Sequence, residues 1–292
     1  MSSSGGQEIK YAVVNGTVRP LDEPQIFLND SYYANGIGVY ETLRFRHARL
    51  YFLSEHIHRL HQSAEIIGIT GLPEESEIRR HLQLLIRENR LVSSNIKVLL
   101  LKNSRGCDLY MYPVEIPPLK GNQDPDFPEP IGVDLAAYRG ERHFPRAKSL
   151  SMLLSTRALE HAREWGCWDS VLIDRRDLML EGSRANLYWL EEDGLYSPPE
   201  DSILSGVTRM NFRKSLEKHG IGMKEGLLSY DDFLARPRPL LMTSTSIAVQ
   251  PVKRFIDLDG NTLELPVDGR TDEYARMYGE YLRSYGRSLN NA

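Results

Sequence analysis

Lys148-Ser149-Leu150 opens a series of short motifs in the second half of the chain. Glu181-Gly182-Ser183 follows 33 residues later, and Asn186 stands close behind it. The series continues with Leu204-Ser205-Gly206-Val207-Thr208-Arg209 and ends with Thr243-Ser244-Thr245. It therefore combines one lysine, one acid and two clusters of hydroxyl groups with backbone amides.

Together these groups are the parts needed to hold a pyridoxal phosphate. A lysine amine can form a Schiff base with the aldehyde, and a carboxylate can keep the pyridine nitrogen protonated. A helix N-terminus and hydroxyl-rich turns can bind the phosphate dianion. A single lysine is usually a solvated surface charge, so the interpretation depends on the order and spacing of all the motifs.

In this order and spacing the series resembles the fold-type IV pyridoxal-phosphate enzymes, also called class IV aminotransferases. The family includes branched-chain aminotransferases, D-amino acid aminotransferases and aminodeoxychorismate lyases. The resemblance extends from about residue 10 to about residue 256. It implies an α+β, two-domain fold of the D-amino acid aminotransferase type, aminotransferase activity, pyridoxal phosphate as cofactor and a homodimer that completes each site.

The resemblance also implies a role for each motif residue. Lys148 would carry the cofactor as a Schiff base and then move the substrate proton, and Glu181 would contact the pyridine nitrogen. Leu204 would pack on the face of the ring. The phosphate would be bound from three places in the chain: Arg59, the helix start at Val207 and Thr208, and the hydroxyls of Ser244 and Thr245.

Two of these residues have an equally plain structural interpretation. Asn186 would either contact the cofactor or act as a hydrogen-bonded amide that anchors the local turn. Tyr40 corresponds to a family tyrosine near the substrate carboxylate, but it would also fit as a half-buried tyrosine of a strand. Both alternatives stay open at the level of sequence.

The substrate is expected to depend on the segment Ser104-Arg105-Gly106-Cys107-Asp108-Leu109-Tyr110-Met111-Tyr112. Lyases of the family often carry an Arg-Gly pair and a second arginine, and D-amino acid aminotransferases carry an arginine and a histidine in the same loop. Here Arg105 is present, Tyr110 stands about where the second arginine would fall, and no histidine follows in that loop. This departure counts against an unmodified D-amino acid or aminodeoxychorismate specificity.

A pocket lined by Tyr40, Leu109, Tyr110 and Met111 would accept an aliphatic or aromatic amino acid, or a simple amine. The expected reaction therefore moves an amino group between a branched-chain or other apolar amino acid and a 2-oxo acid. The alternative within the family is a lyase-type β-elimination that gives 4-aminobenzoate and pyruvate. The alternative outside enzymes is a non-catalytic protein that has kept the fold.

Composition sets the outer limits of function. The 292 residues are 41% hydrophobic and 26% charged, with 36 basic against 40 acidic residues and a net charge of −4. This balance gives no general electrostatic case for binding nucleic acid or an anionic membrane.

Cys107 and Cys167 are far apart and predict two free thiols in a reducing compartment, so a cytoplasmic enzyme is expected. The polar start, Met1 to Gly6, predicts a disordered tail rather than a signal peptide.

Apolar periodicity predicts a smaller N-terminal α+β domain over residues 1–112. Its elements are a hairpin at 11–18, strands at 39–45, 50–53 and 96–101, and helices at 54–67 and 74–90. Ser54 is expected to cap the first helix, with Ile57, Leu60, Ala64 and Ile67 facing inward. Residues 113–130 contain six prolines and predict an interdomain linker.

Residues 131–292 predict a larger C-terminal α/β domain that carries the cofactor lysine. The expected elements are a helix at 150–165, strands at 171–173, 187–190, 195–196 and 240–245, a helix from Gly206 to Gly220, and a last helix capped by Thr271. Trp165 is expected on the buried face of the helix at 150–165. The last helix carries Tyr274, Tyr278, Tyr281 and Tyr285 on one side, which suits either core packing or a subunit interface.

Two rival motifs carry little weight. His56, His58 and His61 have the residue type of metal ligands, but on a helix His56 and His58 point about 160° apart, so no metal site is expected. Gly36-Ile37-Gly38 is too short for a dinucleotide loop, which needs a complete strand, loop and helix.

Overall fold

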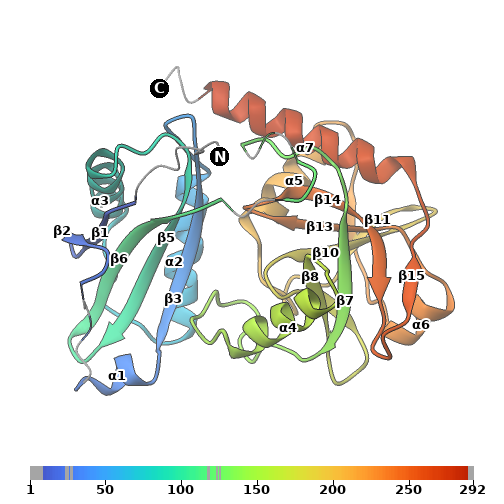
Figure 1. The fold of residues 1–292 in the computed structure, drawn as a ribbon, viewed down its shortest axis with the longest axis horizontal. Helices are drawn as coiled ribbons and strands as arrows, with labels where there is room; N and C mark the ends of the chain where they lie inside the picture. Colours follow the sequence, from blue (N-terminus) through green and yellow to red (C-terminus); the bar gives the residue numbers. More distant parts are fainter. Residues whose placement is uncertain are drawn as a thin grey trace, which may run out of the picture. The chain divides into compact units, whose positions relative to one another are not determined.

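The computed structural model describes residues 9–23, 26, 29–116, 119–122, 124 and 126–288. The chain divides into two compact units (Figure 1). The first comprises Met1–Pro117 and Ala147–Ser151, and the second comprises Pro118–Arg146 and Met152–Ala292. The expected tail at Met1 to Gly6 lies outside the described residues, as do four residues of the proline-rich segment 113–130.

The first unit is a six-stranded sheet covered by two helices. The strand order is β2-β1-β6-β5-β3-β4, and every pairing between neighbours is antiparallel. Its elements are β1 (Tyr11–Val14), β2 (Thr17–Pro20), α1 (Ser31–Ala34), β3 (Gly38–Arg46), β4 (Arg49–Tyr51), α2 (Leu53–Ile66), α3 (Glu75–Glu88), β5 (Ser94–Asn103) and β6 (Gly106–Val114). Mixed helix and strand content of this kind is that of an α+β fold.

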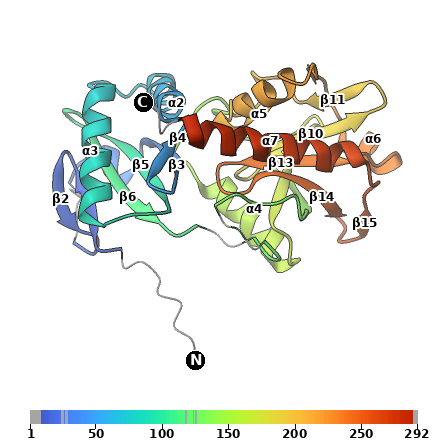
Figure 2. The same cartoon turned by 90° about the horizontal axis from the view of Figure 1, so that it is seen from above.

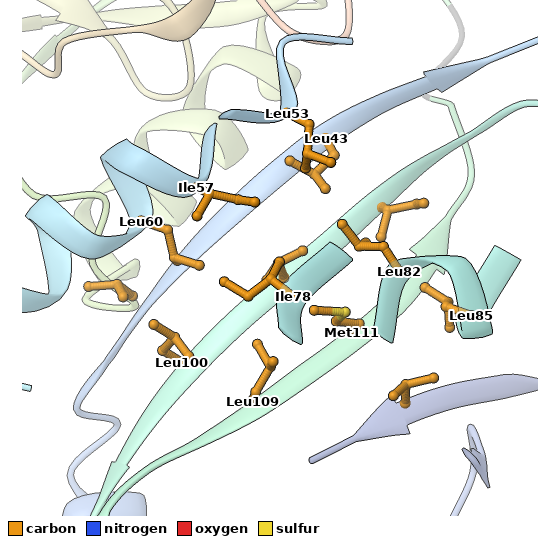
Figure 3. Packing of buried hydrophobic residues seen from close by; sticks show 14 of the residues in the cluster. Leu43, Leu53, Ile57, Leu60, Ile78, Leu82, Leu85, Leu100, Leu109 and Met111 are labelled. Atoms are coloured by element: carbon orange, nitrogen blue, oxygen red, sulfur yellow. The ribbon is translucent and has the colours of Figure 1, made fainter. Parts of the chain in front are cut away.

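The core of this unit lies where α2 and α3 meet the sheet. Figure 3 shows Ile57 and Leu60 of α2 and Ile78 and Leu82 of α3 directed toward strand residues such as Leu43. The inward face predicted for the first of these helices is therefore confirmed, and α3 packs on the sheet in the same way. Burying side chains of this size contributes roughly 1.5–3 kcal/mol each relative to exposure, so these contacts hold the helices on the sheet.

Turn residues determine two local features of the first unit. The predicted hairpin forms with Asn15 and Gly16 at φ of 47° and 78°, as a tight turn between two strands requires. The predicted Ser54 cap is wrong, because α2 already begins at Leu53, after Phe52 in the left-handed region at φ 53°. The Ser54 hydroxyl instead donates to Glu75.

The second unit is built on a nine-stranded mixed sheet. Its strand order is β12-β11-β10-β13-β14-β7-β8-β9, with β15 paired to β14. The elements are β7 (Val133–Arg139), α4 (Leu153–Glu164), β8 (Asp169–Ile173), β9 (Met179–Gly182), β10 (Asn186–Glu191), β11 (Gly194–Ser197), α5 (Val207–Glu217), β12 (Met223–Glu225), α6 (Tyr230–Ala235), β13 (Leu240–Ser244), β14 (Ala248–Ile256), β15 (Thr262–Glu264) and α7 (Gly269–Ser288). Because β9 also pairs with β10, the strands from β10 round to β9 close on themselves.

The closed strands separate two packing faces. Leu135 and Phe255 belong to the cluster inside the ring, together with Phe233 of α6. Their chain neighbours Ala136 and Ile256 pack instead with Ala162 of α4, because successive side chains of a strand point to opposite faces. The sequence alternation thus separates the interior of the ring from the face covered by α4.

The long helix α7 lies alongside α5 (Figure 2). Tyr278 is buried and packs edge-on against Phe212 of α5, and the Tyr281 hydroxyl donates to Asn211. Packing within the unit therefore accounts for these two tyrosines. The predicted cap at Thr271 is wrong, because α7 begins at Gly269 and the Thr271 hydroxyl donates to the Asp268 carbonyl.

The segment Ala147–Ser151 belongs to the first unit, although residues 131–292 were expected to form one C-terminal domain. The Leu150 N–H donates to the Gly38 carbonyl, and Val39 and Ser149 form an antiparallel bridge. β4 covers only the far end of β3, so this segment extends along the part of the edge that β4 leaves open. The helix expected from residue 150 therefore begins at Leu153.

Trp165 is a further correction, because it follows the last residue of α4 and is half exposed rather than buried. Its ring lies against Gly260, where an added Cβ would come within 2.7 Å of it. In the described part of the chain, no helix combines the length and hydropathy needed to cross a membrane.

Candidate active site

Lys148 is held through its main chain by two elements of the first unit. Its N–H donates to the Ser63 hydroxyl of α2 at 3.1 Å, and its carbonyl accepts from the Tyr40 N–H of β3 at 2.9 Å. The side chain is partly buried, and Nζ lies 4.6 Å from the centre of the Tyr40 ring. The base of the side chain is therefore fixed, and the amine rests against an aromatic face.

Tyr40 of β3 contacts Lys148 both through its main chain and through its ring. Its side chain is buried, and Lys97 of β5 also places its Nζ 4.4 Å from the ring centre. A tyrosine flanked by two amines fits both interpretations that the sequence left open, a substrate-side residue and a structural strand residue. Its contact with a substrate carboxylate stays a prediction.

Arg59 lies in a buried group of charged side chains next to this lysine. Its Nε and one Nη donate to the two carboxylate oxygens of Glu41, at 2.6 and 2.7 Å. His56 Nδ1 lies 2.7 Å from the same carboxylate. Glu41, His56 and Arg59 are each at most 6% exposed, so water screens this group little.

Burial and pairing act in opposite directions on these groups. Burial by itself would raise the pKa of Glu41, but Arg59 and His56 hold it far below its ordinary value. Burial lowers the pKa of His56, only partly offset by Glu41, so the ring is neutral at pH 7. A neutral His56 donates its Nδ1 hydrogen to an ionised Glu41.

Glu181 lies in the second unit at the point where its sheet closes. Its Oε2 accepts the Leu204 N–H at 3.2 Å, and its Oε1 lies 3.3 Å from Arg142 Nε. The carboxylate is buried and borders a cavity of about 230 Å³ that Arg142 and Ser202 also line. The contact with Arg142 is an ion pair, and an Nη of Arg142 donates a hydrogen bond to the Ser183 carbonyl, which holds the guanidinium beside Glu181.

Asn186 connects three of the sequence motifs. In the strand register it pairs with Glu181 on one side and with Thr243 on the other. Its side-chain amide donates to the Leu204 carbonyl at 2.8 Å, and a Cβ added to Gly206 would lie 2.1 Å from its Oδ1. This geometry is that of the turn-anchoring alternative, and it explains why residue 206 must be glycine.

The N-terminus of α5 suits an anion. The helix begins at Val207 after Gly206, which has no side chain to accept hydrogen bonds from the first-turn amides. Those amides and the helix dipole favour a negative group at this end. Thr208 is buried in this first turn, and Ser244 ends β13, with Thr245 directly after it and partly buried.

The proposed substrate segment is mostly a strand rather than a loop. Arg105 is exposed in the tight turn between β5 and β6 and borders a cavity of about 510 Å³ with Asp108 and Tyr33. Tyr110 is buried further along β6, with its hydroxyl 3.4 Å from that of Tyr33. Asp108 accepts hydrogen bonds from Tyr33, Asn15 and Asn103.

The expectation that Leu109 and Met111 line this pocket is wrong. Both belong to the apolar core under α2 and α3. Strand alternation sends Asp108 and Tyr110 to the other face of β6, so that face is polar and aromatic rather than aliphatic.

The histidine arrangement follows the helical geometry. His56 is buried against Glu41, whereas His58 is exposed. Within the described ranges, no cluster of three or more histidine, cysteine, aspartate or glutamate side chains is placed to hold a metal ion.

Comparison with known proteins identifies the family. The profile of the family described as amino-transferase class IV matches residues 38–255, most of the chain. The chain belongs to the class IV aminotransferases. Pyridoxal phosphate, the cofactor of this family, is therefore the cofactor of this enzyme.

Three known proteins illustrate the relationship. The D-alanine aminotransferase of Bacillus licheniformis is 28% identical over 264 residues, which cover 85% of this chain and 88% of the relative. The crystal structure of a branched-chain aminotransferase from Thermoproteus uzoniensis with norvaline has a TM-score of 0.78 at 21% identity, covering 93% and 94% of the two chains. A hypothetical aminotransferase from Mycobacterium tuberculosis in its PLP-bound form matches with the same TM-score at 19% identity, covering 94% and 99%. The expected α+β, two-domain fold is thereby confirmed.

The donor set of this aminotransferase fits its cofactor. A partly buried lysine residue, a buried carboxylate and a helix N-terminus without a side-chain cap are the kinds of group that would suit an aldehyde, a pyridine nitrogen and a phosphate. Sequence reasoning missed Arg142 and Glu41. A signal for Glu41 was available, because it takes an inward position in the strand between Val39 and Leu43, where a carboxylate is unusual.

Proposed function

We propose that this class IV aminotransferase transfers the amino group of an amino acid with an apolar side chain, branched-chain or similar, to a 2-oxo acid. The observation that carries the assignment of Lys148 as the catalytic residue is its anchoring by Ser63 and Tyr40, which places a partly buried amine on an aromatic face. The substrate class is supported by relatives named for D-alanine and for branched-chain amino acids, one of them crystallised with norvaline.

When bound, pyridoxal phosphate supplies an aldehyde carbon and an electron-withdrawing ring. Lys148 Nζ is the group that would hold that carbon and would move the proton at the substrate Cα. The Tyr40 ring beside Nζ limits the directions from which a substrate approaches.

The other residues hold chemical groups rather than move protons. Glu181, kept in place by the Leu204 amide and Arg142, would accept a hydrogen bond from the pyridine nitrogen, and Leu204 would pack on the ring. The phosphate is assigned to the amides of Val207 and Thr208, the hydroxyls of Ser244 and Thr245, and Arg59. Asn186 serves by shaping the turn that carries Leu204.

For the substrate we propose that Tyr40, Arg105 and Tyr110 contribute contacts. Arg105 has the charge to bind a carboxylate, and it is exposed beside a cavity. Tyr110 offers a hydroxyl next to that of Tyr33. The polar and aromatic character of this face suits the carboxylate end of a substrate better than an aliphatic side chain.

The experiment is an absorbance titration of the purified holoenzyme with single L- and D-amino acids, followed by a 2-oxo acid. Loss of the cofactor band with an apolar amino acid and its return with the 2-oxo acid are expected. A band that responds to no apolar amino acid contradicts the substrate class. Release of pyruvate from aminodeoxychorismate without an amino acceptor would instead assign the lyase reaction.

We further propose a homodimer located in the cytoplasm. Cys107 and Cys167 are free thiols, and burial raises the pKa of each to about 11, so both stay protonated at neutral pH. Free thiols of this kind are typical of proteins in a reducing compartment. Light scattering of the purified enzyme tests the dimer, and a molar mass of one chain at working concentration would exclude it.

A further inference from the structure

A carboxylate lies in the apolar core of the first unit. Glu41 occupies a strand position whose neighbours two residues away, Val39 and Leu43, belong to the cluster under α2 and α3. It is 1% exposed, and α2 supplies both of its side-chain partners, Arg59 and His56. The burial is thus matched by a dedicated set of donors on one helix.

Burying such a charged group costs free energy, so its presence needs an explanation. Removing an ion pair from water costs several kcal/mol per charge, and well-packed apolar side chains often stabilise a fold equally well. A buried ion pair is therefore weak evidence for stability and better evidence for a site. The same helix also contacts Lys148, whose charge acts on His56 and whose N–H donates to the Ser63 hydroxyl.

The contacts fix the orientation of Arg59. Both oxygens of Glu41 are engaged by Nε and one Nη, which defines the plane and rotation of the guanidinium. His56 in turn holds the oxygen that receives the Nη hydrogen. A planar guanidinium gripped along one edge presents its other edge in a fixed direction.

We propose that Glu41 is a positioning residue that acts through Arg59. It grips the Nε edge of the guanidinium, so that the opposite edge meets the phosphate of the cofactor without reorganisation. His56 locks Glu41 in this role. The proposal rests on the assignment of Arg59 to the phosphate of pyridoxal phosphate, and it extends that assignment to two residues that touch no cofactor.

The test compares pyridoxal phosphate with pyridoxal, which lacks the phosphate. Dissociation constants for both are measured by absorbance and fluorescence on the apoenzymes of wild type and Glu41→Gln. The amide keeps the shape of Glu41 but loses the charge and one acceptor oxygen. We expect Glu41→Gln to weaken binding of pyridoxal phosphate by about tenfold or more, about 1.4 kcal/mol, and to leave binding of pyridoxal unchanged.

A double-mutant cycle shows whether the effect passes through Arg59. In an Arg59→Lys background there is no planar guanidinium to orient. Glu41→Gln should then cause no further loss of affinity for pyridoxal phosphate relative to pyridoxal. Glu75→Gln is the matched control, because Glu75 pairs with Arg79 in an exposed contact of the same unit. It should change neither constant.

The outcomes separate this inference from the proposed function. Equal losses for both ligands in Glu41→Gln, or no loss in either, would overturn the positioning role while pyridoxal phosphate remains the cofactor. Failure of the wild-type apoenzyme to prefer pyridoxal phosphate over pyridoxal would overturn the phosphate assignment itself. If Glu41→Gln does not fold, His56→Leu decides: a smaller loss confined to pyridoxal phosphate supports the proposal, and any other pattern contradicts it.

Discussion

The two groups of residues assigned to the cofactor are built on different principles. Around Lys148, in the first unit, buried charges of Glu41 and Arg59 are paired side chain to side chain. Around Asn186, in the second unit, side chains bond to backbone groups, as in the bond to the Leu204 carbonyl. The first arrangement orients charged groups, and the second shapes a turn.

This difference predicts how each group responds to substitution. Removing one partner of a buried ion pair leaves an unpaired charge, which costs several kcal/mol. Removing one side-chain bond to the backbone costs about 1–3 kcal/mol and loosens a turn. Changes to the ion pairs near Lys148 should therefore affect charge, and changes to the side-chain bonds of Asn186 should affect local geometry. Glu181 combines both kinds of contact, because it pairs with Arg142 and accepts the Leu204 N–H.

Replacement of Lys148 has the largest expected effect. Lys148→Ala removes the amine that binds the cofactor carbon and moves the proton, while the main-chain bonds to Ser63 and Tyr40 remain available. Turnover should be abolished, and the circular dichroism spectrum and melting temperature should stay close to those of wild type. Steady-state turnover by this variant would remove Lys148 from its catalytic role.

Glu181→Gln should come next. The amide keeps the bond from the Leu204 N–H but cannot hold the pyridine nitrogen in its protonated form or pair with Arg142 as a charge. We expect kcat to fall by about 100-fold, the scale of losing one positioned electrostatic group, with a smaller change in cofactor affinity. An unchanged kcat would place Glu181 outside the reaction.

A smaller effect is expected at Gly206. In Gly206→Ala the new Cβ would lie 2.1 Å from Asn186 Oδ1, so the turn ahead of α5 must move. The free energy of unfolding should fall by about 1–3 kcal/mol, and the affinity for pyridoxal phosphate should fall with it. Gly222→Ala is the matched control, because nothing lies within 4 Å of an added Cβ there. Equal effects in both variants would contradict the role of the turn.

The smallest effect concerns pH. Burial lowers the pKa of His56 in the folded state, so below the ordinary value of 6.5 the unfolded chain binds more protons and stability decreases as pH falls. Glu41, with a lowered pKa, adds a further loss below about pH 4.5, its ordinary value. His56→Leu should make the first part of this decrease shallower, as measured by urea unfolding between pH 7.5 and pH 5, a range chosen around the pKa of histidine.

The exposed neighbour His58 provides the comparison for this measurement. His58→Leu is the same substitution on the solvent side of α2, and it should leave the slope of stability against pH as in wild type. A slope that His56→Leu does not alter would show that His56 contributes nothing to the acid response of the first unit.

Short sequence patterns predicted turns and helix faces correctly where these features depend only on neighbouring residues. The Asn15-Gly16 turn and the stripes of α2 and α3 follow from backbone freedom and helical period alone. The caps at Ser54 and Thr271 were wrong because each helix begins earlier than its polar residue indicated. The start of α2 follows Phe52 in the left-handed region, and the Asp268 carboxylate accepts the Arg270 N–H ahead of Thr271. Leu109 and Met111 were misassigned because a strand, not a loop, decides which face each side chain takes.

The sequence by itself determined the family, the cofactor and the residue types of the candidate site, because the motifs carry the required chemistry wherever they lie. The tertiary structure alone decided which of them become neighbours. Strand pairing joined Glu181 and Thr243 to opposite sides of Asn186. Pairing with the open edge of β3 places Lys148 in the first unit, the unit that also contains Glu41 and its partners. These contacts join residues far apart in the chain, and their register depends on sheet topology, which no local period encodes.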